Sequence, residues 1–463
     1  MSRSCDVRSD LKMKWANPKI EVRLGQMPSG WDREVIFFAN LRSIFYRNQS
    51  QTQVLAERVK GLESYGGRLI PILNLLFRGR NNLLVLEAPP AESLVAYFEH
   101  HLELSLPSLQ ILPHADYQEL VKNRSDSCVA ALLKNHPARW LDGFVTDEAL
   151  QALQEITGKS TISTTAGSQR GNNKLALHEY LEQNGFKVFD TYLATDLHEV
   201  NECLKKLNRG GYRKAALKSQ IGASGIGMMV VDAVGDLEAS PPEYYFHDGP
   251  CLVQGWLESG CLGTQQVCSP SVQLFLKENL ISLYDWTDQI LSNDSVHEGN
   301  ISPPVSLQHN EEVGKSIIEQ AQETAKWLHR QGYRGTASVD FLVTQGDSEF
   351  TVYVAEINAR VTGATYPSML ACHFLPGGAW LMRNLRFRAH PSPEQVLDIL
   401  TKSDSLFLPG HPQGVLPINF NMDEDHRVAK GQLLILAESP RSCSALLGEV
   451  EDLFKRTLDY DRD

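Results

Sequence analysis

The most informative part of this sequence is Tyr333–Pro367, YRGTASVDFLVTQGDSEFTVYVAEINARVTGATYP. It predicts two strands joined by a polar turn at 345–348, because apolar residues recur at every second position on both sides of that turn. Some positions break the apolar pattern, although a buried charge is costly unless it is paired or bound to a metal. They are Asp340, Glu356, Asn358 and Arg360, and together they point to a functional site.

The four residues are expected on one side of the sheet. Glu356, Asn358 and Arg360 are two positions apart, so their side chains point the same way. If the strands pair across the turn, Asp340 reaches that side too. Oxygen ligands suit Mg²⁺, which is usually held by one or two carboxylates plus substrate phosphates. The pattern predicts a metal site of Asp340, Glu356 and Asn358; the alternative is an ordinary polar sheet face.

Composition limits the possible classes of protein. A chain of 463 residues is too long for one core and predicts two to four lobes. A net charge of −12 without any Lys/Arg run argues against nucleic acid or an anionic membrane as partner. We find no signal sequence and no apolar run that could span a membrane. The eight cysteines are scattered without zinc-site spacing, so we expect them reduced, in a cytoplasmic protein.

Residues 1–160 are expected to form an α/β domain with a parallel sheet, after an irregular start over 1–30. Strand candidates alternate with helical segments in this part of the chain. No GxGxxG sequence follows the first strand, so a dinucleotide site is not supported. The expected strands are at 34–40, 81–87, 109–112 and 143–145, and a polar loop is expected at 163–173.

A glycine-rich turn joins two predicted strands at 219–227. Glycines let backbone N–H groups approach phosphate oxygens closely, and Lys218 stands directly before this turn. The turn does not match the loop that precedes a helix in the nucleotide-binding P-loop, and a plain hairpin is the alternative. A later strand, 252–257, ends in a segment whose backbone groups are suited to an adenine edge.

The rest of the chain predicts an irregular polar loop at 292–310 and a long amphipathic helix over 311–332. The apolar stretch 369–382 is expected to be helical on both sides of a break at 376–378. From about residue 385 onward, two strands and a closing helix predict an appended α/β subdomain.

These features together resemble the ATP-grasp superfamily of ligases over about residues 160–385. The resemblance is carried by Lys174 before a helix, Lys218 before a glycine-rich β-loop, VQGWLE, and SVDF followed by EINAR, in that order. It implies an α/β ATP-grasp fold with a Rossmann-like preceding domain over 1–160. The ATP-grasp domain would cover 161–385, with a small lobe at about 186–255 and a large lobe at about 256–385. A C-terminal α/β subdomain would cover 386–463, distantly like that of the peptide ligase of pheganomycin biosynthesis.

The resemblance also implies roles for individual residues. Asp340, Glu356 and Asn358 would bind Mg²⁺, as two ions, with Mn²⁺ as an alternative. Arg360 and Lys218 would be catalytic, Arg360 by stabilising the transferring phosphoryl group. Segments 297–303 and 362–367 would face the substrates. ATP would contact Lys174, Lys218, Ser219, Gly222, Ser224, Gly225, Gly227, Gln254, Gly255, Trp256, Leu257 and Glu258.

One position departs from the family pattern. Family members often carry a ribose-binding carboxylate a few residues beyond the adenine-binding segment, where this chain has Ser259–Thr264. Glu258 is the candidate substitute for that carboxylate.

The activity implied is that of an ATP-dependent carboxylate–amine ligase. A carboxylate would attack the γ-phosphate of ATP, and the acyl phosphate would react with an amine to give an amide or peptide. The partners would be a small carboxylic acid and an amine, amino acid or peptide, with a homodimer as the suggested assembly. Two alternatives stay open: a carboxylate–thiol ligase, and a catalytically silent ATP-binding regulatory protein, against which the retained site residues argue.

Overall fold

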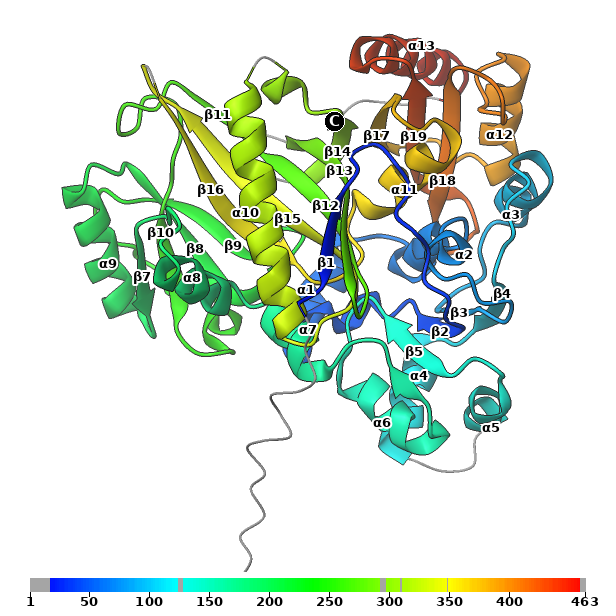
Figure 1. The fold of residues 1–463 in the computed structure, drawn as a ribbon, viewed down its shortest axis with the longest axis horizontal. Coiled ribbons are helices and arrows are strands. Elements are labelled where there is room, and N and C mark those ends of the chain that lie inside the picture. Colours follow the sequence, from blue (N-terminus) through cyan, green and yellow to red (C-terminus); the bar gives the residue numbers. More distant parts are fainter. Residues whose placement is uncertain (1–16, 124–127, 292–296, 309, 348, 459–463) are drawn as a thin grey trace, which may run out of the picture.

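The structure, a computed structural model, describes residues 17–458 except 124–127, 292–296, 309 and 348. Three sheets with flanking helices build the chain, as an α/β fold requires (Figure 1). The first element is a short strand, β1 (Lys19–Val22), so the prediction of an irregular start over 1–30 was wrong there; residues 1–16 of that stretch lie outside the described residues.

The N-terminal domain contains a five-stranded parallel sheet, as predicted from the alternation of strands and helices. Its strands are short and fully buried at the centre, where both faces are covered. The sheet order is β4 (Ser108–Ile111), β3 (Leu83–Leu86), β2 (Val35–Phe38), β5 (Trp140–Gly143) and β6 (Ser160–Thr161). The main helices are α1 (Gln49–Arg58), α3 (Glu92–Ala96), α4 (His114–Asn123), α5 (Cys128–Asn135) and α6 (Glu148–Thr157).

A four-stranded antiparallel sheet forms a separate lobe, which stands to one side in Figure 1. One of its faces is covered by α9 (Leu197–Arg209), whose buried Val200 and Leu204 pack on the strands. Its order is β7 (Thr191–Ala194), β10 (Cys251–Gly255), β8 (Lys214–Ala223) and β9 (Ile226–Asp232).

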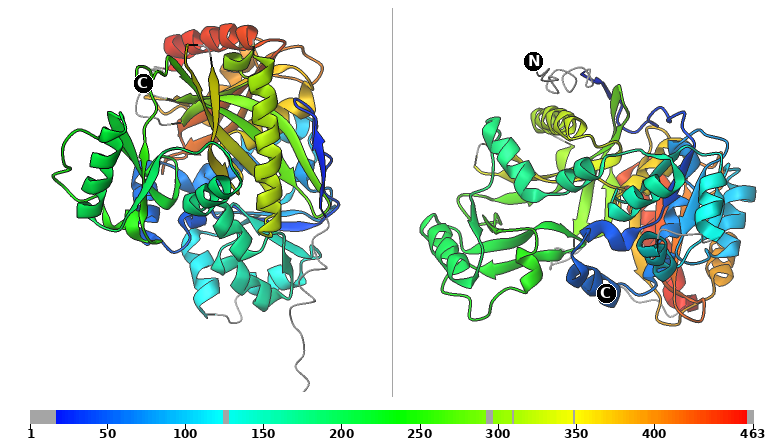
Figure 2. Two further views of the ribbon diagram at one scale, coloured as in Figure 1. Left: turned by 60° about the vertical axis from the view of Figure 1, so that its left-hand side comes forward. Right: turned by 90° about the horizontal axis from the view of Figure 1, so that it is seen from below.

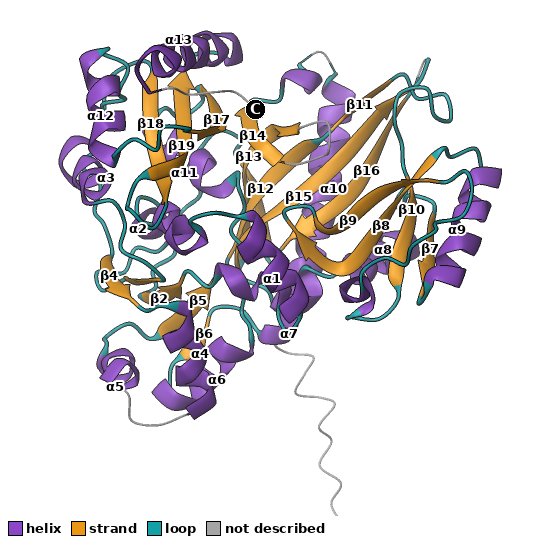
Figure 3. Cartoon of the chain, turned by 180° about the vertical axis from the view of Figure 1, so that it is seen from behind, coloured by secondary structure: helices purple, strands orange, loops and turns teal. Residues whose placement is uncertain are grey.

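The largest sheet has ten strands and runs through the middle of the molecule (Figure 3). The long helix α10 (Glu311–Arg330) covers one face, with Ile317, Ala321 and Leu328 in the core beneath it. The main order is β11 (Gln266–Cys268), β15 (Gly335–Gln345), β12 (Pro270–Leu276), β13 (Leu280–Leu291), β14 (His297–Ser302), β17 (Ala379–Arg386), β19 (Val428–Ala437) and β18 (Gly414–Met422). Beside this path, β16 (Phe350–Asn358) pairs with β15 and β1 with β13.

The C-terminal region continues this sheet, because β17 pairs with both β14 and β19. Around these strands lie α11 (Thr365–Phe374), α12 (Pro393–Lys402) and α13 (Pro440–Leu458). One hydrophobic core joins the C-terminal strands to the N-terminal domain, which lies below them in Figure 1 and in the left-hand view of Figure 2. The division of the chain at residues 160 and 385 stays a prediction.

Three further local predictions were wrong. The expected polar loop 163–173 contains a helix, α7 (Thr165–Gly171), because the Thr164 side chain caps it by accepting from Gly167 N. The expected loop 292–310 contains β14, although 292–296 and 309 lie outside the described residues. The second half of 369–382 forms β17 and not a helix; a short apolar run fits both, and pairing with β14 and β19 selects the strand.

Within the described residues, we find no helix both long and apolar enough to cross a bilayer. The cysteines whose side chains are described are free thiols, in agreement with the predicted reduced state, and Cys261 and Cys268 are not joined to each other. Cys5 and Cys128 lie outside the described side chains.

Candidate active site

The strands β15 and β16 pair as an antiparallel hairpin, as predicted. Asp340 pairs with Glu356 and Ser338 pairs with Asn358, so the proposed metal ligands share one side of the sheet. Asn358 Nδ2 donates to Asp340 Oδ2 at 2.9 Å, and Ser271 Oγ from β12 donates to Oδ1 at 2.6 Å. Burial, and then the charge of Glu356, raise the pKa of Asp340 to about 6. Two carboxylates therefore repel each other in a half-buried place.

Two lysines from other elements approach this pair. Lys174 begins α8 (Lys174–Gln183), which the Asn173 side chain caps, and its Nζ lies 2.9 Å from Glu356 Oε1. Lys218 Nζ, on β8, donates to Gln254 Oε1 at 2.6 Å. Burial lowers the pKa of Lys218 to about 8, against the effect of the Glu356 charge. The predicted phosphate-binding lysines thus lie beside the predicted metal site.

Glu356 is held in its charged form. Burial alone would raise its pKa, but the charges of Lys174, Arg360 and Lys218 outweigh burial, so the pKa is lowered. The site therefore combines the ionised carboxylate of Glu356, the carboxylate of Asp340 with its raised pKa, and three cations. The cations are Lys174, Lys218 and Arg360.

Arg360 is fixed by a residue that the sequence did not identify. Its Nη1 donates to Asn172 Oδ1 at 2.6 Å, and Asn172 stands at the C-terminal end of α7. Asn172 Nδ2 in turn donates to the Ala359 carbonyl at 3.1 Å and to Tyr46 Oη at 3.2 Å. The available signal was the asparagine pair Asn172–Asn173 directly before Lys174, which we had assigned to a loop.

The glycine-rich turn is the tip of the β8–β9 hairpin. Ser224 and Gly225 are exposed at the tip with φ of 53° and 74°, and Gly227 has φ of 78°. A side chain at Gly227 would collide with Ser219 and Gln51, so glycine is required there. Gly222 is buried, and its carbonyl accepts from Lys174 Nζ at 3.4 Å.

Ser219 points into this hairpin and not toward its tip. Its Oγ donates to the Ile221 carbonyl at 2.6 Å and accepts from Gln51 Nε2 at 3.0 Å. Gln51 belongs to α1 of the N-terminal domain and also donates to the Ile221 carbonyl, at 3.1 Å. Gln51 was not identified from the sequence, and the phosphate contact of Ser219 stays a prediction.

The predicted adenine-binding segment, 254–257, spans the end of β10 and the residues directly after it. Gly255 lies against the ring of Tyr212, which leaves no room for a side chain. Trp256 and Leu257 are half-buried. Glu258 accepts from Lys214 Nζ at 3.0 Å and lies 3.5 Å from Arg213 Nη2, so its carboxylate already has two cationic partners. Its ribose contact stays a prediction.

The two segments predicted to face the substrates lie together. His297 packs against Gly363, where a Cβ atom would lie 3.0 Å from His297 Cε1. His297 Nε2 is 2.6 Å from Asn300 Oδ1, and Thr362 Oγ1 donates to Gln273 Oε1 at 3.3 Å. Polar contacts, including those of the buried Gln273 and Asn300, thus extend from the hairpin toward β14.

The donor set fits a magnesium ion. Among the described residues no group of three or more His, Cys, Asp or Glu could hold a metal. Here two carboxylates and the carboxamide of Asn358 come together, and a divalent cation between Asp340 and Glu356 would relieve the repulsion that, after burial, raises the pKa of Asp340. This is the partial ligand set that Mg²⁺ uses when substrate phosphates complete its coordination.

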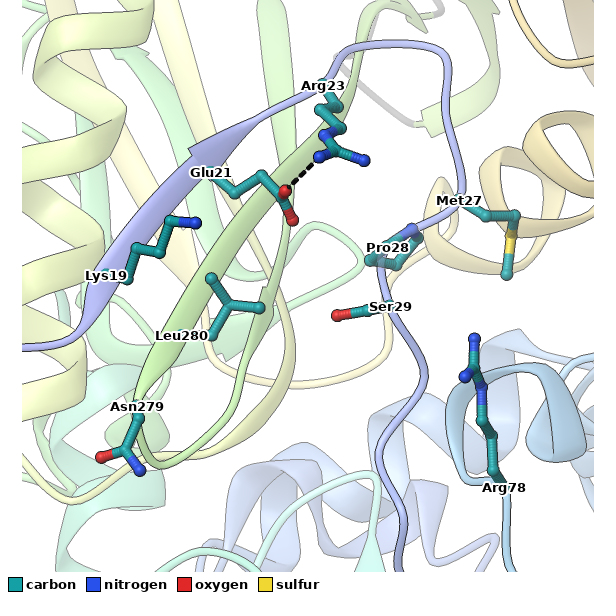
Figure 4. Close-up of a pocket in the computed structure, with 9 residues that line it drawn as sticks. All are labelled: Lys19, Glu21, Arg23, Met27, Pro28, Ser29, Arg78, Asn279 and Leu280. Carbon is teal, nitrogen blue, oxygen red and sulfur yellow. Dashed lines mark ion pairs between the residues drawn. The ribbon is translucent and has the colours of Figure 1, made fainter.

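A pocket of about 490 Å³ lies elsewhere, between β1, the end of the β12–β13 turn and segment 27–29 (Figure 4). Its charged groups include the Arg23–Glu21 ion pair at 2.8 Å. None of its lining residues belongs to the predicted site.

Comparisons with known proteins support an ATP-grasp domain in this chain. Residues 171–364 match the ATP-grasp domain family. Butirosin acyl-carrier protein–L-glutamate ligase from Niallia circulans is 27% identical over 228 residues, 48% of this chain and 51% of that protein. The chain therefore matches about half the length of this curated relative.

Solved structures share the fold over most of the chain. N5-carboxyaminoimidazole synthetase from Staphylococcus aureus, complexed with ADP, gives a TM-score of 0.53 at 12% identity, over 92% of this chain and 99% of that one. Biotin carboxylase from Campylobacter jejuni, in a β-γ-ATP complex, gives 0.54 at 14% identity, over 91% of each chain. These identities support the fold alone, and they confirm the predicted α/β ATP-grasp architecture.

Proposed function

Because this chain contains an ATP-grasp domain, we propose that it is an ATP-dependent carboxylate–amine ligase. It would join a small carboxylic acid to an amine, amino acid or peptide through an acyl phosphate, with release of ADP and phosphate. The observation that carries this proposal is the convergence of Lys174 and Lys218 on Glu356, directly across the strand pair from Asp340.

In this proposal the cationic residues of the site bind phosphate and the acidic residues bind the metal. Lys174 and Lys218 would bind the ATP phosphates, exchanging their present contacts with Glu356 and Gln254 for phosphate oxygens. Mg²⁺ held by Asp340, Glu356 and Asn358 would neutralise the phosphates and polarise the γ-phosphoryl group. Segment 254–258 would hold adenine and ribose.

Arg360 and the glycine-rich hairpin would act on the reacting groups. A guanidinium fixed by Asn172 on the metal side of the sheet is preorganised for the charge that grows as the carboxylate attacks the γ-phosphate. The exposed tip at Ser224 and Gly225 would close over the phosphates and exclude the water that hydrolyses acyl phosphates.

The similar protein from Niallia circulans supports a carboxylic acid as one substrate. Its name states that it ligates L-glutamate to an acyl-carrier protein. We infer that this chain activates an acid of comparable size, and that its acceptor is a primary amine on a small molecule, an amino acid or a peptide.

The test is a screen for ADP formation with acid and amine pairs, with mass spectrometry of the products. A carboxylate–amine ligase releases ADP in proportion to an amide product, and Lys218→Met abolishes both. Lys206→Met, at an exposed position on α9, serves as the matched control. Product formation with thiols but not amines would contradict the proposal in favour of a thiol ligase, and Mg–ATP binding without turnover in any pair would favour a regulatory protein.

A further inference from the structure

The strand β12 carries polar side chains where a buried strand is normally apolar. All of Pro270–Leu276 is buried, and Gln273 and Ser271 are 0% and 2% exposed. Val272 and Leu274 belong to the core beneath α10, so the two polar side chains point to the opposite face of the sheet. A buried amide and a buried hydroxyl are expected to have partners, and here the partners connect two parts of the candidate active site.

The strand register places both polar side chains on the face of the metal site. Ser271 pairs with Asp340 on β15. Gln273 pairs with Ser338, which in turn pairs with Asn358 on β16. Directly paired residues on neighbouring strands point to the same face. Gln273 therefore lies in the row of residues that contains Asn358, and Ser271 in the row that contains Asp340.

A chain of hydrogen bonds runs from Asp340 through these two residues to the segment that leads into α11. Ser271 Oγ donates to Asp340 Oδ1 at 2.6 Å, and Gln273 Nε2 donates to Ser271 Oγ at 3.0 Å. The other end of the same amide accepts from Thr362 Oγ1 at 3.3 Å. Thr362 Oγ1 lies 3.0 Å from Thr365 Oγ1, and Thr362 N donates to that hydroxyl at 3.0 Å. Gln273 thus joins the metal site to the start of α11.

The direction of each bond in this chain follows from Asp340. An ionised carboxylate only accepts, so Ser271 uses its one hydroxyl hydrogen on Asp340 and its oxygen accepts from Gln273. The amide of Gln273 is thereby oriented with its oxygen toward Thr362. If the Asp340 carboxylate turns, the matched donors and acceptors along the chain are lost together.

The rest of α11 is held independently of Gln273. Ser368 on α11 and Trp380 on β17 both donate to the carboxylate of Asp285, which is 1% exposed. The bond from Thr362 to Gln273 is the longest in the chain that leads to the metal site. This bond is therefore the place where a change at the metal site should alter the segment most.

We propose that Gln273 is a positioning residue that couples segment 362–367, which is predicted to face the substrates, to the metal ligand Asp340. The inference rests on the proposed function and deepens it. A cation between Asp340 and Glu356 removes the repulsion between these carboxylates and fixes the one on which the chain ends. Fixing Asp340 orders segment 362–367, and by thermodynamic linkage an ordered segment favours the metal. The segment thus takes its substrate-binding position when Mg–nucleotide is bound.

The test measures amide hydrogen exchange over 362–368 in the full chain, with Mg–ADP and with ADP plus EDTA, each at a nucleotide concentration that calorimetry shows to be saturating. In wild type we expect Mg²⁺ to slow this exchange about fivefold or more, the lower range of couplings between sites. Gln273→Met keeps the length of the side chain, removes the amide and should lose this metal-dependent slowing. Gln320→Met on α10, which covers the other face of the sheet, is the matched control and should keep it.

Two serines distinguish coupling from local support of the segment. Ser271→Ala removes the bond to Asp340, and among the described residues Ser271 is not hydrogen-bonded to 362–368. Ser338 Oγ also donates to Asp340 Oδ1, at 3.3 Å, but its side chain makes no hydrogen bond to Gln273 in the part of the chain that the structure describes. We expect Ser271→Ala to lose the metal-dependent slowing and Ser338→Ala to keep it at saturating Mg²⁺.

Three results would overturn the inference. They are no metal-dependent slowing in wild type, equal slowing in wild type and Gln273→Met, and equal slowing in Ser271→Ala and Ser338→Ala. A role of Gln273 in stability alone would speed exchange by the same factor with and without Mg²⁺, which is the second of these results. If Gln273→Met does not fold, the two serine variants decide between the outcomes.

The proposed function is tested separately, by ADP and amide formation. If amide forms and the coupling is absent, the inference fails and the proposed function survives. If the coupling is present in wild type and lost in Ser271→Ala, but no acid and amine pair gives an amide, the proposed function fails and the positioning role of Gln273 stands.

Discussion

Arg360 Nη1 lies 2.6 Å from Asn172 Oδ1, and this bond joins residues 188 positions apart in the chain. Among the described residues no hydrogen bond or ion pair within 4 Å joins Arg360 to Glu356, although its charge helps to lower the pKa of Glu356. The neutral amide of Asn172 therefore orients the guanidinium of Arg360, and its other N–H groups are available to a substrate.

This geometry predicts a selective loss in Arg360→Lys. A planar guanidinium can donate to Asn172 and to a phosphoryl oxygen at the same time in a fixed geometry. The single ammonium of lysine cannot reproduce that geometry. We expect Mg–ATP affinity close to wild type and ligation reduced by about a hundredfold or more, the usual loss for one transition-state donor. ATP titration beside amide formation measures both. Wild-type ligation in this variant would make Arg360 a structural residue.

Lys218→Met should separate activity from stability. Burial already lowers the pKa of Lys218, so the folded state carries a cost for its charge that methionine removes. We expect an unchanged or higher Tm and a loss of ATP turnover of roughly a hundredfold or more. Thermal melts with and without Mg–ATP, together with ADP assays, decide this. An ATP-induced shift and a rate equal to wild type would remove Lys218 from the phosphate site.

Asp142 on β5 should make stability depend on pH. It is 7% exposed, and burial raises its pKa to about 8 from an ordinary value of 3.8. The folded state thus binds a proton that the unfolded chain releases above pH 4. Its contribution to stability is complete below about pH 4 and is lost as pH rises to about 8.

Replacing Asp142 with the neutral isostere asparagine removes this dependence. We expect Asp142→Asn to raise Tm relative to wild type more at pH 8 than at pH 5, in melts at matched ionic strength. An equal difference at both pH values would show that Asp142 keeps an ordinary pKa in the folded protein.

Gln51 should restrain the glycine-rich hairpin, because it donates to both Ser219 Oγ and the Ile221 carbonyl. Gln51→Ala should speed amide hydrogen exchange over 219–227 while the β2–β3 strands stay protected. The control is Thr52→Ala, because the Thr52 hydroxyl donates to the Arg42 and Asn48 carbonyls and not to the hairpin. Identical exchange in wild type and Gln51→Ala would mean that these bonds do not hold the hairpin.

The sequence was sufficient where chemistry interrupts a regular pattern. Asp340 and Glu356 were identified because charges stand in otherwise apolar strands, and the register confirms that they pair. It was insufficient where function depends on long-range partners. Nothing in the local sequence distinguishes Asn172 and Gln51 from other polar residues. Their roles come from contacts with Arg360 and Ser219, which are distant in the chain. Residues 379–382 form an apolar run that fits helix or strand equally, and only pairing with the neighbouring strands selects the strand.

The central claim is that a carboxylate oxygen attacks the γ-phosphate of ATP. The most direct measurement uses an acid labelled with ¹⁸O in its carboxylate, in a productive pair, with ³¹P NMR of the released products. Acyl-phosphate chemistry predicts one ¹⁸O atom in each inorganic phosphate and none in ADP. Unlabelled phosphate beside a labelled product, or ¹⁸O in AMP, would contradict it.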